Sequence, residues 1–77
     1  MESPRSEMFR KLLQRDASNP MVLYSLGNEL FKEGRHAEAR EVFAKGREVA
    51  TENGDLQTVK EIDVFRRRLD KRAAGEG

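Results

Sequence analysis

The chain has no cysteine, and this absence excludes a disulfide framework and every metal site that uses thiolate ligands. No apolar run approaches the length of a membrane span, and Met1 to Arg5 lack the apolar stretch of a signal peptide. Fifteen basic residues against fourteen acidic ones leave a formal charge of +1, so general attraction to nucleic acid or membranes is weak. We therefore expect a cytoplasmic protein that has no membrane partner.

The chain also has little that suggests catalysis. Its carboxylates are scattered, so no pair stands out as an acid/base couple. His36 is the only histidine, which leaves one possible base for a serine nucleophile and one ring ligand for a metal, where three or four ligands are needed. We expect no enzyme activity, no catalytic residue, no metal and no cofactor, and a structural or exposed role for His36 beside the turn after Gly34.

Helical periodicity occurs in four segments, and no segment has the pattern of a strand. We expect one all-α domain over residues 1–77. The expected helices are 4–15, 20–33, 36–52 and 55–72, and residues 73–77 are expected to form a disordered tail.

Local stop and start signals set these limits. Ser3-Pro4 and Asn19-Pro20 each combine an N-cap with proline at the first helical position. Gly34 ends the second helix, because glycine adopts the left-handed conformation without steric cost. Asn53-Gly54 ends the third helix, and Asp55 is expected to cap the fourth.

The second and third helices are joined by so few residues that they must form an antiparallel hairpin. We expect Gly27, Ala39 and Gly46 to lie on the faces that would meet, where small residues let the two backbones approach. Eight small and apolar residues of this hairpin form one spacing pattern, which we call the hairpin motif: Leu23, Leu26, Gly27, Leu30, Gly34, Ala39, Phe43 and Gly46.

The spacing of these eight residues over 20–53 resembles the 34-residue tetratricopeptide repeat (TPR). Family members commonly have an aromatic residue in place of Leu23, tyrosine in place of Leu30 and proline in place of Thr51. The resemblance implies an array of helical hairpins of the right-handed α-solenoid type. When the sequence is aligned with itself at a shift of 34 residues, Met8 aligns with Val42 and Phe9 with Phe43. We therefore interpret the first helix as the second helix of a preceding, degenerate repeat.

The fourth helix does not continue the repeat, and we interpret it as a capping helix. The chain thus carries about one and a half repeats plus a cap, whereas such arrays generally need three or more repeats. Either the caps suffice, or two chains share a core as a homodimer.

A second stripe on the second helix lies apart from its leucine face. The resemblance implies that this stripe lines a concave groove for a peptide segment or a partner helix, formed by Met21, Tyr24, Ser25, Asn28, Phe31 and Lys32. Asn28 matches an asparagine with which family members bind a peptide carboxylate, but Tyr24 replaces the lysine of that clamp, which favours a more apolar ligand. The alternative is that Tyr24 and Phe31 pack against the first and fourth helices as part of the core.

A protein–protein interaction module is therefore the leading hypothesis, and homodimerisation is the second. A third is nucleic-acid binding through the basic residues of the fourth helix: Lys60, Arg66, Arg67, Arg68, Lys71 and Arg72. A solvated helix face is the stronger interpretation of these cations, because they complement the helix dipole and Asp63 can pair with Arg67.

Overall fold

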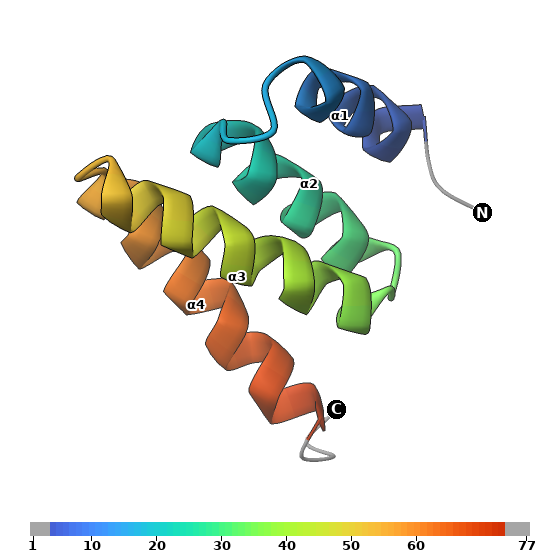
Figure 1. The fold of residues 1–77 in the computed structure, drawn as a ribbon. Coiled ribbons are helices and arrows are strands. Elements are labelled where there is room, and N and C mark those ends of the chain that lie inside the picture. The colour runs from blue at the N-terminus through green and yellow to red at the C-terminus, as the bar shows by residue number, and fades with distance from the viewer. Residues whose placement is uncertain (1–3, 74–77) are drawn as a thin grey trace.

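The computed structural model describes residues 4–73, and the side chains of residues 4–71 (Figure 1). It confirms the all-α fold. The four helices are α1 (Pro4–Arg15), α2 (Pro20–Lys32), α3 (His36–Glu52) and α4 (Leu56–Ala73). Ala73 is thus helical, which corrects the expected start of the tail at 73. Ser3, the expected cap of the first helix, and residues 74–77 lie outside the described residues.

The predicted stop and start signals act as expected at four helix ends. The Asn19 side chain accepts hydrogen bonds from the backbone N–H groups of Met21 at 3.1 Å and Val22 at 3.3 Å. Gly34 has a φ of 79° after α2 and Gly54 has a φ of 73° after α3, and both have the left-handed conformation expected where a helix ends. At the start of α4, the Asp55 carboxylate accepts a hydrogen bond from the Thr58 backbone N–H at 3.2 Å.

The four helices form a slab in which each runs antiparallel to the one before it (Figure 1). The Cα atoms extend over 36 × 30 × 14 Å, so the slab is thin in one direction. α2 and α3 form the central hairpin, α1 packs along α2, and α4 packs along α3 and also contacts α2. Over residues 4–73, no helix has the length and apolar character of a membrane span.

The core lies between the central hairpin and α4. Its fully buried members include Leu26 and Leu30 of α2, Phe43 of α3, and Ile62 and Leu69 of α4. The predicted close approach of α2 and α3 occurs at Gly27: a Cβ atom placed there would lie 2.5 Å from the Phe43 ring. The ring occupies the space that the missing side chain leaves.

Candidate functional site

The predicted groove residues lie on one side of α2, and we call them the α2 stripe: Met21, Tyr24, Ser25, Asn28, Phe31 and Lys32. The two ends of the stripe are open, because Met21 is 55% exposed and Lys32 is exposed as well. The four residues between them are half-buried. Leu23, Leu26 and Leu30 are buried on the other side of the helix, so the two stripes face different surroundings.

Phe65 of α4 packs against the middle of the α2 stripe. Its ring centroid lies 5.8 Å from that of Tyr24 and 5.7 Å from that of Phe31. On the side of the core it stacks on Phe43 at 5.7 Å. Tyr24 and Phe31 therefore form part of an aromatic cluster with residues of α4 and α3. Their contact with α4 is the packing that the core alternative expected for the fourth helix. Both side chains nevertheless remain partly exposed.

The pKa of Tyr24 is affected by burial and by charged groups of α4. Burial raises the pKa of Tyr24 above its ordinary value, the negative charge of Glu61 raises it further, and the positive charge of Arg68 opposes both effects. The Arg68 guanidinium carbon lies 5.2 Å from the centroid of the Phe65 ring, a cation–π contact. Glu61 and Arg68 thus add polar groups beside the aromatic part of the stripe.

The polar members of the α2 stripe differ in how far they are already engaged. The Ser25 hydroxyl donates a hydrogen bond to the Met21 carbonyl oxygen at 2.9 Å, one turn back along the helix. The Lys32 ammonium lies 4.0 Å from a carboxylate oxygen of Glu29, which is closer to Arg5, at 3.2 Å. Lys32 therefore retains capacity to bind an additional acceptor.

His36 lies at the start of α3, where its ring meets Phe31 edge to face at 5.4 Å. Its Nδ1 atom is buried and has no hydrogen-bond partner among the described residues. The part of the chain that the structure describes holds no group of three His, Cys, Asp or Glu side chains placed to bind a metal. The geometry of His36 is that of a packing residue at the hairpin turn.

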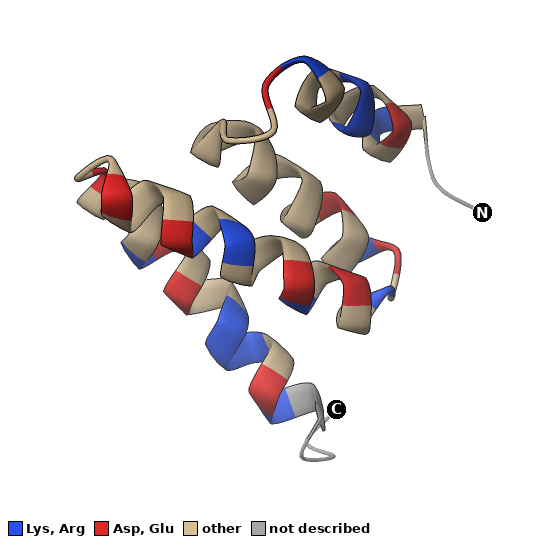
Figure 2. Cartoon of the chain, in the orientation of Figure 1, with Lys and Arg blue, Asp and Glu red and all other residues tan. Residues whose placement is uncertain are grey.

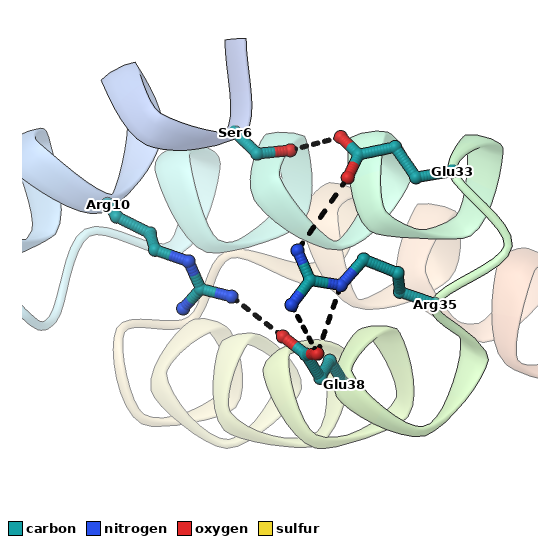
Figure 3. Close-up of polar contacts among 5 residues, drawn as sticks. All are labelled: Ser6, Arg10, Glu33, Arg35 and Glu38. Carbon is teal, nitrogen blue, oxygen red and sulfur yellow. Dashed lines mark hydrogen bonds and ion pairs between the residues drawn. The ribbon is translucent and has the colours of Figure 1, made fainter. Parts of the chain in front are cut away.

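A polar network that the sequence did not predict joins α1 to the α2–α3 turn (Figure 3). The buried Ser6 hydroxyl donates a hydrogen bond to the Glu33 carboxylate. Arg35 pairs with both Glu33, at 3.9 Å, and Glu38, at 2.6 Å, and Arg10 of α1 reaches Glu38 at 2.9 Å. Ser6 and Glu33 are 27 residues apart in sequence, so local patterns carry no sign of the contact.

Two arginines of α3 pair with two aspartates of α4 across the helix interface. Arg47 donates to Asp63 at 2.8 Å, and Arg40 donates to Asp70 at 2.6 Å. The hydrogen bond to Asp63 and its negative charge raise the pKa of Arg47. The expected pairing of Asp63 with Arg67 along α4 is therefore wrong: the carboxylate faces α3 and also lies 3.9 Å from Arg66.

Figure 2 shows that Lys and Arg recur along α4, and the side chains of these residues differ in their contacts. Arg66 lies beside Asp63, and Arg68 lies over Phe65. Arg68 is exposed, as are Lys60, Arg67 and Lys71, and these last three have no ion pair or cation–π contact among the described residues. The side chain of Arg72 lies outside the described residues.

Comparisons with protein-family models, with curated proteins and with solved structures gave no match. Two features stand out for recognition: the α2 stripe, with its exposed ends and aromatic middle, and the cations on α4.

Proposed function

We propose that this chain is a protein-binding module of the TPR type, whose α2 stripe holds a peptide segment or a partner helix. The observation that carries the proposal is the form of the stripe. Half-buried rings lie between an exposed methionine and an exposed lysine, and the leucine face that serves the core lies elsewhere on the helix.

The stripe combines the kinds of contact that protein interfaces use. Met21 offers a pliable apolar side chain. Tyr24 and Phe31 offer half-buried rings that already pack against Phe65, so little side-chain entropy is lost when a ligand binds. Asn28 and Lys32 supply hydrogen-bonding groups for orientation. An extended or helical segment with an apolar residue near Met21 and an acceptor near Lys32 fits this order.

Peptide selection from a random library, with the whole chain as bait, tests the proposal. Changes to Tyr24 or Phe31 would disturb the aromatic cluster, so the affinity of a selected peptide is better tested at Met21. We expect Met21→Ser to weaken binding about fivefold or more, since it removes an apolar contact. Met8→Ser is the matched control, because Met8 is a methionine of similar exposure, 49%, on α1. Equal affinity of both variants would contradict the proposal.

Self-association is a second candidate, which the surface of α1 favours. Met8 and Leu12, one turn apart, are 49% and 43% exposed. α1 packs along α2 and contributes no other helix packing in the described residues. A homodimer would cover this pair. The test is the mass in solution over about micromolar to millimolar concentration: a mass that doubles in the wild type and stays monomeric in Leu12→Ser would support the dimer.

A cytoplasmic location is part of the proposal. Fractionation of cells that express the tagged chain would test it.

A further inference from the structure

Three cations and two aliphatic side chains share one side of α4, which we call the outer face: Leu56, Lys60, Val64, Arg67 and Lys71. They recur at intervals of four, four, three and four residues, the spacing of a single helix face. All five are exposed, Leu56 to 65% and Val64 to 43%. α4 lies at one edge of the slab (Figure 1), and because all five side chains are exposed, no described helix covers this face.

The carboxylates that could neutralise the outer face are engaged elsewhere. Asp63 and Asp70 both face α3, where Arg47 and Arg40 donate to them. Within the described part of the chain, no carboxylate lies within ion-pair distance of the three outer-face cations. The face is therefore locally positive although the formal charge of the whole chain is only +1.

The interface between α3 and α4 indicates what kind of helix matches such a face. Arg40 and Arg47 are seven residues apart on α3, and Asp63 and Asp70 are seven residues apart on α4. Because the two helices run antiparallel, Arg40 pairs with Asp70 and Arg47 pairs with Asp63. On the outer face, Lys60 and Arg67 are also seven residues apart. An antiparallel helix with carboxylates at the same spacing, and aliphatic side chains between them, would form a second such interface.

We propose that the outer face of α4 binds an acidic amphipathic helix of another protein, docked antiparallel along α4. Charge complementarity supports the acidic partner. Leu56 and Val64 favour a protein over a nucleic acid, because phosphates provide no apolar surface and Phe65 packs inward instead of offering a ring for base stacking. Two aliphatic side chains are also a small apolar area for a membrane surface. The outer face is separate from the α2 stripe, so either proposal can fail alone.

Fluorescence anisotropy with a labelled synthetic peptide tests this binding. The peptide has about 18 residues, enough for a marginally stable helix, with glutamates seven residues apart and leucines between them. We expect it to bind the whole chain with micromolar affinity, and more weakly as salt is added. A peptide of the same composition with glutamates at a non-helical spacing should bind about tenfold more weakly. Equal binding of the two peptides would overturn the proposal.

Charge-reversal variants locate the site. Lys60→Glu combined with Arg67→Glu should weaken binding about tenfold. Lys11→Glu combined with Lys45→Glu makes the same change in net charge at exposed positions of α1 and α3, and should stay within about twofold of the wild type. Circular dichroism would check that both variants remain helical. Equal losses in the two variants would mean that only net charge matters, and would overturn the site.

Three further results would also overturn the proposal. One is tighter binding of a single-stranded RNA than of the acidic peptide, and a second is tighter binding of anionic vesicles. The third is a mass that doubles with concentration in the wild type but not in the Lys60→Glu/Arg67→Glu variant, since a second copy of this chain would then be the occupant.

Discussion

Phe65 of α4 stacks on Phe43 of α3, with ring centroids 5.7 Å apart and 18° between the ring planes. The same Phe65 ring packs against Tyr24 and Phe31 of the α2 stripe. One side chain therefore connects the buried core to the proposed binding surface. Changes within this aromatic cluster should affect stability first and binding second.

Replacing Phe65 with alanine should destabilise the fold substantially. The change removes ring contacts to three aromatic side chains and leaves a cavity, which costs about 2–4 kcal/mol in a small domain. Val64→Ala is the neighbouring control, because Val64 is 43% exposed and should cost about 0.5 kcal/mol or less. Urea unfolding followed by circular dichroism measures both, and similar values for the two variants would show that Phe65 does not hold α4 in place.

Tyr24 should make stability depend on pH at the alkaline end. Its pKa is raised in the folded chain, chiefly by burial, above the unfolded value of 10.0. The folded state thus retains the phenolic proton longer than the unfolded state does. Stability is unaffected by this group below pH 10.0 and falls as pH rises from there through the folded pKa.

Tyr24→Phe isolates this contribution, because tyrosine occurs only once in the chain. The difference in unfolding free energy between the wild type and the variant should be constant below pH 10.0 and should shift against the wild type above it. A difference that is independent of pH would contradict a raised pKa. Absorbance titration of the wild type measures the same pKa directly.

Gly27→Ala should destabilise the hairpin although alanine is the better helix former. The new methyl group would lie 2.5 Å from a Phe43 ring carbon, so the ring must move. Overpacking of this kind costs about 1–3 kcal/mol, which over most of that range exceeds the ~1 kcal/mol gained in helix propensity. At Gly46 the nearest contacts are 3.1 Å, to Ile62 and Leu23, and the loss should be smaller. Thermal unfolding of both variants shows which alanine substitution destabilises the fold more. A Gly27→Ala variant more stable than the wild type would contradict the close approach of α2 and α3 at Gly27.

Ser6→Ala should loosen α1. The buried hydroxyl donates to Glu33 at the α2–α3 turn, so its removal should cost about 1–2 kcal/mol. Ser25→Ala is the matched control, because its hydroxyl bonds within its own helix and should change stability by about 0.5 kcal/mol or less. Hydrogen exchange should accelerate in α1 more than in α3. Hydrogen exchange that accelerates equally along the whole chain would show that Ser6 does not stabilise α1 in particular.

The helix limits and the central hairpin were predictable because their causes are local. Asn19 and Gly34 act on backbone groups a few residues away, and the pattern of small residues places Gly27 on the face that meets α3. Such features need no knowledge of how distant helices cross. They account for the agreement between expected and observed helices.

The contacts between distant helices were not predictable in the same way. Periodicity places Phe65 on the apolar face of its helix, but its insertion against Tyr24 and Phe31 depends on the crossing of α4 over α2 and α3. Asp63 was expected to pair along its own helix, and it pairs across the interface with Arg47. Peptide binding by the α2 stripe stays a prediction.

The central claim is that the α2 stripe is a binding surface, and NMR mapping of the whole chain with a library-selected peptide tests it most directly. We predict that the backbone amide shifts change most at Met21, Ser25, Asn28 and Lys32, with small changes on α1 and on the exposed side of α3. A footprint centred on α1 or α3, with the α2 stripe unchanged, would contradict the account.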